Sequence, residues 1–370
     1  MKYRLAKSRQ RGRKSGRWLA ILLLAALAGG VWYFSRPVKH KQKPKRVVVA
    51  LPAGTIPAPP LKKTAPLPAP AVETDWALGV PAGTSVRPPR NPLEAQIALS
   101  RLGISCGSLD GAIGSQTRAA IAAFQRKLHL LETGALDTNT RPALALASPP
   151  FTSYTVTSND LARLQPLSKT WLGKSRQSAL EYETVLELVA EKSHAHPRQI
   201  KLLNPDADWT NILAGATLTV PDAAYPEPET KAAFAIIRLS EKTLAAFDEN
   251  TNLLAHFPCS IAKRVEKRPV GELHVAAVAP NPNYTFDPEV FPEVPEAREI
   301  GRKLILPPGP NNPVGTVWMS LDKAGYGIHG TPKPEEVGRT ESHGCFRLAN
   351  WNAEFLLKLV WIGMPVRVEP

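Results

Sequence analysis

A proline-rich stretch constrains this chain more than any other feature of its sequence. Residues 37–92 contain 13 of its 37 prolines. Because proline fixes φ and lacks a backbone N–H, neither a helix nor a β-ladder propagates through such a stretch. The sequence therefore predicts a semi-rigid extended spacer over residues 35–91, which holds the folded part of the chain away from the N-terminus.

An uncharged apolar run, residues 18–34, precedes this spacer and follows the basic segment 1–17. Its length lies at the lower limit for a membrane-spanning helix, about 17 residues. Aromatic residues lie at both ends, where a membrane interface accepts them. We expect an N-terminal membrane anchor, with residues 1–17 in the cytoplasm and the rest of the chain exported. The small residues 26–29 also fit a signal peptide that is cleaved to release a secreted protein.

The basic charge of the chain is concentrated at its N-terminus. The formal net charge is +14, and 14 of the 46 Lys and Arg residues lie within residues 1–46, which contain no Asp or Glu. In the remainder of the chain, basic residues equal the 32 acidic residues in number. This balance argues against nucleic acid as a partner of the folded part.

Residues 92–148 have the pattern of a small helical unit. A helix is expected to begin at Pro92 and to be capped near Gly103, and a second should place Ile121, Phe124 and Leu128 on one face. The sequences "LDGAIGSQTRAAIAAFQ" and "TGALDTNT" resemble the peptidoglycan-binding domain 1 family. That resemblance implies a three-helix unit that binds the bacterial cell wall, and a helical bundle without a binding role is the alternative.

Residues 151–222 carry a weaker, mixed pattern. The sequence "IKLLNPDADWTNILAGATLTVP" resembles the end of a LysM module, another fold that binds wall glycan, although the middle of the region is longer than such a module. The alternative is a spacer domain that only packs against its neighbours.

Residues 231–370 change to short apolar-alternating runs, which predict a β-rich domain. A helix is expected over residues 350–363, with Asn350 or Asn352 as its N-cap and Gly363 as its C-cap, followed by a closing strand. The fold class is therefore multi-domain α+β, with a small helical unit, a mixed middle region and a β-rich C-terminal domain. Since no phosphate-binding loop, EF-hand or HExxH motif is present, we expect no cofactor and no metal.

Two short motifs in this last domain bear on chemistry, "YGIHGTP" with His329 and "SHGCFRL" with His343 and Cys345. A thiol becomes a good nucleophile when an imidazole takes its proton. His343 shares a face with Cys345 on an extended segment. His329 approaches from a separate segment, which is the commoner arrangement, and we favour it as the base.

The residues around the thiol suggest further roles. Gly344 leaves its own amide and that of Cys345 able to face a carbonyl oxygen, as an oxyanion hole requires. Arg347 is placed to bind a carboxylate. The alternatives are an inert buried cysteine, a zinc site that lacks an obvious fourth ligand, and a disulfide between Cys259 and Cys345. Since the chain has only three cysteines, Cys106 being the third, at least one thiol should be free.

The sequences "IHGTP" and "SHGCFRL" together resemble the signature of the YkuD-type L,D-transpeptidase catalytic domain. The match continues through "PVGELHV", "LPPGPNNPVGTVWMSL" and "GMPVRV", so that it covers residues 231–370. The resemblance implies that Cys345 is the nucleophile and His329 the base. It also implies further site residues, with His343 and Gly344 in the catalytic set and Ser342, Gly330, Thr331 and Arg347 in contact with substrate.

The same resemblance implies a reaction on peptidoglycan. A thioester forms between the cysteine and the third residue of a wall stem tetrapeptide, and the terminal D-alanine leaves. The acyl group then passes to an amine on another stem peptide or on an envelope protein. With water as the acceptor the enzyme would be an L,D-carboxypeptidase, and a domain that only bound stem peptides would be a non-catalytic scaffold.

Overall fold

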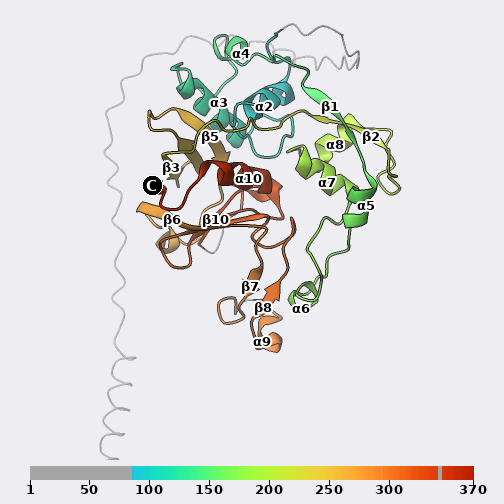
Figure 1. The fold of residues 1–370 in the computed structure, drawn as a ribbon. Helices are drawn as coiled ribbons and strands as arrows, with labels where there is room; N and C mark the ends of the chain where they lie inside the picture. Colours follow the sequence, from blue (N-terminus) through green and yellow to red (C-terminus); the bar gives the residue numbers. More distant parts are fainter. Residues whose placement is uncertain (1–85, 293, 341–343) are drawn as a thin grey trace, which may run out of the picture. The chain divides into compact units, whose positions relative to one another are not determined.

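The computed structural model describes residues 86–292, 294–340 and 344–370 (Figure 1). The expected anchor and nearly all of the expected spacer lie outside these residues, as do Ser342 and His343. Within the described ranges, no helix is both long enough and apolar enough to cross a bilayer. All described residues belong to one compact unit, Gly79–Pro370.

The helical unit consists of α2 (Pro92–Ser100), α3 (Ser115–Lys127) and α4 (Thr140–Ala143). Pro92 occupies the first turn of α2, as predicted, behind an Asn91 cap whose side chain accepts from the Glu94 N–H. Leu128 was expected on the buried face but is 44% exposed, because α3 ends one residue before it. α2 likewise ends before Gly103, which adopts φ +75° beyond the helix.

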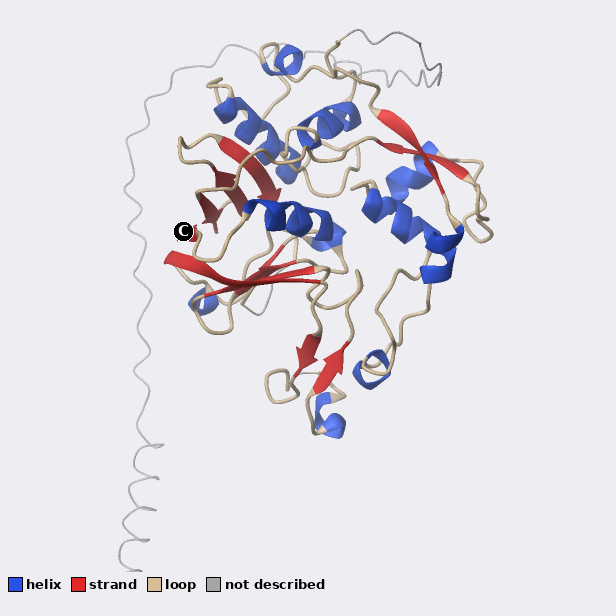
Figure 2. Ribbon diagram, in the orientation of Figure 1, coloured by secondary structure: helices blue, strands red, loops and turns tan. Residues whose placement is uncertain are grey.

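The middle region contains one two-stranded sheet and four short helices (Figure 2). Its elements are β1 (Phe151–Thr155), α5 (Ser158–Arg163), α6 (Trp171–Lys174), α7 (Val185–Lys192), α8 (Pro197–Leu203) and β2 (Thr217–Pro221). β1 and β2 pair antiparallel, with Phe151 opposite Pro221. The unusual length of the region lies in the segment around α6, where Trp171 stacks on Phe286 of the C-terminal domain at 4.3 Å between ring centroids. The LysM resemblance remains a prediction.

The C-terminal domain is built on an eight-stranded mixed sheet with the order β11-β10-β9-β6-β12-β3-β4-β5. The strands are β3 (Phe234–Arg238), β4 (Thr243–Phe247), β5 (Leu253–Pro258), β6 (Gly271–Pro280), β9 (Val317–Leu321), β10 (Gly327–His329), β11 (Phe346–Arg347) and β12 (Pro365–Glu369). The apolar-alternating runs correspond to β3 through β6, and the expected closing strand is β12. The prediction of a β-rich domain is confirmed.

The helix α10 (Asn350–Leu359) packs against this sheet and differs from expectation at both ends. Its N-cap is Ala349, because the Asn350 side chain is bonded to other segments instead of to the first turn of the helix. Its C-cap is Val360, and Gly363 lies in the following turn with φ +98°.

A small arm extends from the sheet and consists of β7 (Tyr284–Phe286), α9 (Ala297–Ile300) and β8 (Leu304–Leu306). β7 and β8 pair antiparallel. Phe286, Leu304 and Leu306 form a separate apolar cluster with Leu180 of the middle region. The arm is therefore packed jointly by two regions of the chain.

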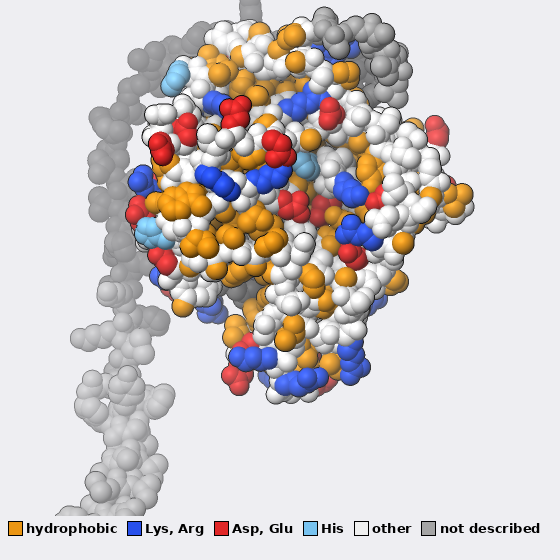
Figure 3. Space-filling model, in the orientation of Figure 1, with side chains coloured by type: hydrophobic (Ala, Val, Ile, Leu, Met, Phe, Trp, Pro, Cys, Tyr) orange, Lys and Arg blue, Asp and Glu red, His pale blue; other side chains and the backbone are white. Residues whose placement is uncertain are grey.

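The helical unit and the sheet also share a core. Ala245, Phe247 and Leu253 of β4 and β5 are buried in one cluster with the side chains of α2 and α3. At the sheet edge, Ile104 forms a bridge with His256 of β5, and the Ser105 N–H donates to the His256 carbonyl at 2.8 Å. On the face shown in Figure 3, basic and acidic side chains are interspersed, in keeping with a folded part whose charges balance.

Candidate active site

The two sequence motifs meet at one edge of the large sheet. β10 and β11 pair in parallel, with Ile328 opposite Phe346 and His329 opposite Arg347. Cys345 immediately precedes β11, and its Sγ lies 3.6 Å from the carbonyl oxygen of Gly325. The connection between the motifs, which includes the short 3-10 helix η2 (Pro334–Glu336), thus returns the chain to the side of His329.

His329 is a buried, neutral imidazole in a fixed orientation. Its Nδ1 lies 2.6 Å from the carbonyl oxygen of Gly330. Since a carbonyl only accepts, Nδ1 carries the proton and Nε2 is the acceptor. The ring stacks on Trp318 of β9 at 5.5 Å between centroids. Burial lowers the pKa of His329 to about 4, the Gly330 hydrogen bond opposes that shift, and the charge of Arg347 adds to it.

The pKa of the Cys345 thiol shifts in the opposite direction. Burial raises its pKa above the ordinary value, while a hydrogen bond from the backbone of Gly327 and the charge of Arg347 lower it. The opposite pKa shifts of Cys345 and His329 favour a neutral thiol and a neutral imidazole over the ion pair that an adjacent histidine suggests. Proton transfer would accompany attack on the substrate.

The positive charge of Arg347 lowers the pKa of both His329 and Cys345. Its backbone pairs with His329 on one side and with Ser260 on the other, and its N–H donates to the Ser260 carbonyl at 3.0 Å. Of the described residues, the Tyr326 ring would be the nearest to a Cβ added at Gly344, at 4.0 Å.

Tyr284, on the arm, also lies near the thiol. Burial raises the pKa of Tyr284 to about 12, and negative charge on Cys345 contributes to the shift. Neither Tyr284 nor Trp318 was predicted as a site residue, because an aromatic residue within a strand is ordinarily a packing residue.

The other two cysteines take no part in this site. Cys106 and Cys259 are buried, and all three cysteines are free thiols. The alternative of a Cys259–Cys345 disulfide is therefore wrong. Burial raises the pKa of both Cys106 and Cys259, which makes them poor nucleophiles. Among the residues that the structure describes, no group of three His, Cys, Asp or Glu side chains is placed to hold a metal ion.

Asn350 holds the residues that follow His329. The sequence predicted Asn350 only as a possible N-cap of the last helix. Its Oδ1 accepts from the Thr331 N–H at 3.0 Å and from the Thr316 N–H at 3.2 Å. A Cβ at Gly330 would lie 2.2 Å from that oxygen, so the close approach requires glycine. These contacts support a positioning role for Gly330 and Thr331, and contact with substrate remains a prediction for both.

Comparison with known families agrees with this geometry. Residues 232–368 match the family YkuD, described as "L,D-transpeptidase catalytic domain". Residues 90–144 match the family described as "Putative peptidoglycan binding domain".

Individual relatives point the same way. "Putative L,D-transpeptidase YkuD" of Bacillus licheniformis is 25% identical over 185 residues, which are 50% of this chain and 93% of that protein. "Probable L,D-transpeptidase YbiS" of Escherichia coli K12 is 28% identical over 44% of this chain, which spans 53% of that relative's length.

Solved structures include an L,D-transpeptidase from Mycobacterium smegmatis, with a TM-score of 0.30 and 18% identity over 43% of this chain and 65% of that one. L,D-transpeptidase 3 from Mycobacterium tuberculosis has a TM-score of 0.30 and 19% identity over 43% of this chain and 77% of that one.

The C-terminal domain thus has the motifs of Cys345 and His329 at one sheet edge, on a chain with a second unit that matches a peptidoglycan-binding family. Residues 232–368 are similar to the YkuD family of L,D-transpeptidase catalytic domains, and this match together with the named relatives supports an L,D-transpeptidase enzyme. The non-catalytic scaffold is therefore set aside.

Proposed function

We propose that the enzyme forms a thioester between Cys345 and the third residue of a peptidoglycan stem tetrapeptide. The observation that carries this proposal is the register of β10 and β11, which lays His329 beside the segment of Cys345 and Arg347. A neutral imidazole whose Nδ1–H is bound to Gly330 keeps Nε2 as a proton acceptor.

In the proposed reaction, the Cys345 sulfur gives its proton to Nε2 of His329 and bonds to the carbonyl carbon of the third stem residue. The bond from that carbon to the D-alanine nitrogen breaks, and His329 gives the proton to this leaving amine. A second amine then attacks the thioester carbon and the carbon–sulfur bond breaks. The proton that this amine loses returns to Cys345 through His329.

The proposed acceptor is an amine of another stem peptide or of an envelope protein. The closest alternative uses water, which would make the enzyme an L,D-carboxypeptidase. The wall-binding unit supports peptidoglycan as the partner, and we propose that the apolar run at residues 18–34 anchors the enzyme in the inner membrane, on the periplasmic side.

Product analysis tests this function. The purified chain is incubated with a disaccharide tetrapeptide, with and without an amine acceptor, and products are identified by mass spectrometry. We expect D-alanine release and a cross-linked product that depends on the acceptor, with both lost in Cys345→Ala. Cys259→Ala serves as the matched control and should retain activity. Tripeptide without cross-linked product would favour the carboxypeptidase, and no D-alanine release at all would contradict the proposal.

A further inference from the structure

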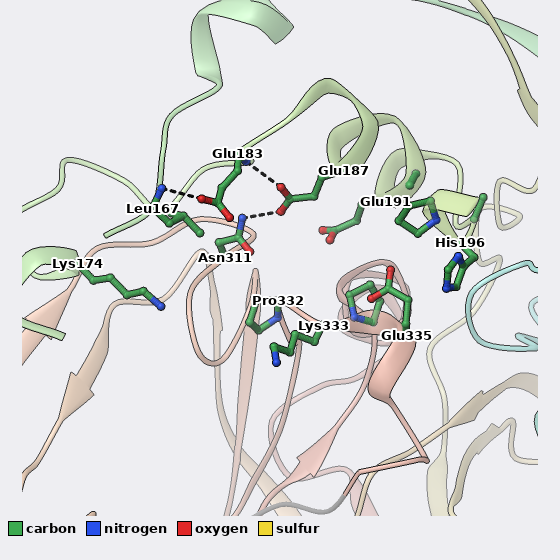
Figure 4. A pocket seen from close by; sticks show the side chains of 14 residues that line it. Leu167, Lys174, Glu183, Glu187, Glu191, His196, Asn311, Pro332, Lys333 and Glu335 are labelled. Carbon is green, nitrogen blue, oxygen red and sulfur yellow. Dashed lines mark hydrogen bonds between the residues drawn. The ribbon is translucent and has the colours of Figure 1, made fainter. Parts of the chain in front are cut away.

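A cavity of about 540 Å³ lies between the middle region and the segment that follows His329 (Figure 4). Its walls come from α7, the start of α8, Asn311 and residues 332–335. Glu187, Glu191 and Glu335 are among the side chains that line it. The middle region thus lies directly against the loop that joins the two halves of the active site.

Glu191 of α7 connects this wall to the active site through Asn350. The Asn350 Nδ2 donates to Glu191 Oε1 at 2.8 Å and to the Pro310 carbonyl at 3.1 Å. The Oδ1 of the same amide accepts from the Thr331 N–H, two residues beyond His329. One planar amide therefore joins the middle region to the backbone of the catalytic histidine's segment.

This amide has little freedom, because Asn350 is buried and both ends of its side chain are bonded. The carbonyl of Gly330 accepts from His329 and so fixes the tautomer of that imidazole. Gly330 itself packs closely against Asn350 Oδ1. A rotation of the amide would therefore move the acceptor that orients the His329 ring.

We propose that Glu191 is a positioning residue for the reaction, acting through Asn350 to hold the Gly330–Thr331 backbone and thereby the orientation of His329. The middle region then contributes to the active site, in addition to any role that it has in wall binding. This inference rests on the proposed function insofar as His329 is the base.

A second Glu–Asn pair in the same cavity provides a matched control. Asn311 Nδ2 donates to Glu187 Oε1 at 2.6 Å, so this pair also joins α7 to the C-terminal domain. The same Nδ2 also donates to the Glu181 carbonyl, which belongs to the middle region and not to the segment after His329. Glu187→Leu thus removes a comparable contact between the same two regions without touching Asn350.

The test compares Glu191→Leu, Glu191→Gln and Glu187→Leu in the full chain. Two quantities are measured, the rate of Cys345 acylation by a disaccharide tetrapeptide and the imidazole ¹⁵N chemical shifts of His329 at pH 7, with melting temperature as the folding control. We expect Glu191→Leu to lower the acylation rate about tenfold with little change in KM, since one positioning hydrogen bond is lost, and to shift the His329 nitrogens away from the pattern of an Nδ1–H tautomer. Glu191→Gln, which keeps an acceptor for Asn350, should restore most of the rate and the ¹⁵N shifts, and Glu187→Leu should leave both unchanged.

Two outcomes would overturn the inference. Either Glu191→Leu reacts as fast as the unmutated enzyme, or Glu187→Leu slows the reaction equally, in which case docking of α7 alone accounts for the effect. If Glu191→Leu does not fold, Asn350→Asp takes its place, because it keeps the acceptor for Thr331 and removes the donor to Glu191. The ¹⁵N shifts need no wall substrate, so they test the inference even if tetrapeptide acylation, and with it the proposed function, fails, and unchanged shifts in Glu191→Leu would then overturn it.

Discussion

At the scale of single residues, burial sets the charge of the reacting pair. The pKa of the Cys345 thiol is raised and the pKa of the His329 imidazole is lowered, and desolvation is the largest cause of both shifts. The charge of Arg347 favours the thiolate but disfavours the imidazolium, so it does not stabilise a resting ion pair.

This charge state predicts the pH dependence of alkylation. The rate at which iodoacetamide modifies Cys345 should rise about tenfold per pH unit from pH 6 to pH 8, without a plateau, because only the thiolate reacts. The rate is measured by intact-protein mass spectrometry. A plateau between pH 5 and pH 7 would show a resting ion pair and contradict the neutral charge state.

Glu191 predicts a pH dependence of stability. Its pKa is raised to about 8, chiefly by burial and also by repulsion from Glu354, against the hydrogen bond from Asn350. An unfolded glutamic acid titrates near pH 4.3, so between about pH 4.3 and 8 the folded chain keeps a proton that the unfolded chain has lost. The stability from this group is complete below that range and is lost as the pH rises through it.

Glu191→Gln should therefore flatten the fall in melting temperature between pH 5 and pH 8. Thermal denaturation of both proteins at several pH values measures this difference. The other titrating groups are common to the two proteins, so identical slopes would show that Glu191 does not carry the raised pKa.

The motifs around His329 and Cys345 indicate the two proposed reacting residues from their local sequence alone. Asn350 and Trp318 were missed as site residues for a physical reason. Their roles depend on which strands and loops lie beside them, and no local pattern records that neighbourhood. Asn350 is the clearest case, because the polar residue expected as a helix cap bonds instead to Thr316, Thr331 and Glu191.

At the scale of elements, the alternation of apolar and polar residues predicted the longer strands but not the shortest ones. β3 through β6 have five to ten residues, enough to show a period of two. β10 and β11 have three and two residues, so neither shows a period, yet their pairing builds the site. The order of the sheet, with β12 parallel to β3, also lies beyond local patterns.

The close approach of Gly330 to Asn350 gives a prediction at this scale. Gly330→Ala should lower the acylation rate about a hundredfold, because its Cβ would displace the amide that holds this segment. Overpacking should also cost about 1–3 kcal/mol of stability. Gly114→Ala, where an added Cβ meets nothing within 4 Å, is the control. An unchanged acylation rate in Gly330→Ala would contradict the positioning role that we assign to the Asn350 contact.

At the scale of the whole molecule, the three folded regions are packed together and not strung along a flexible chain. The helical unit shares a core with β4 and β5, and the middle region stacks His194 on Trp351 of α10 at 5.3 Å between ring centroids. The sequence predicted the helical unit and the β-rich domain, but their shared core arises from long-range packing that composition does not reveal.

Deleting residues 1–148 should therefore destabilise the remainder of the chain. The apolar side chains of Ala245, Phe247 and Leu253 would become exposed, and we expect the melting temperature to fall by about 10 °C relative to a chain that begins at residue 86. Differential scanning calorimetry of the two proteins measures this change. An unchanged melting temperature would show that the helical unit is independent of the sheet.

The proposed mechanism depends above all on Cys345 as the residue that carries the acyl group. The most direct measurement is the intact mass of the full chain after brief mixing with a disaccharide tetrapeptide, followed by acid quenching and peptide mapping. The mechanism predicts an added mass equal to the substrate less D-alanine, located on Cys345, released by hydroxylamine and absent in Cys345→Ala. If the quenched chain releases D-alanine but no thioester is found on Cys345, or if the adduct lies on another residue, the mechanism is wrong.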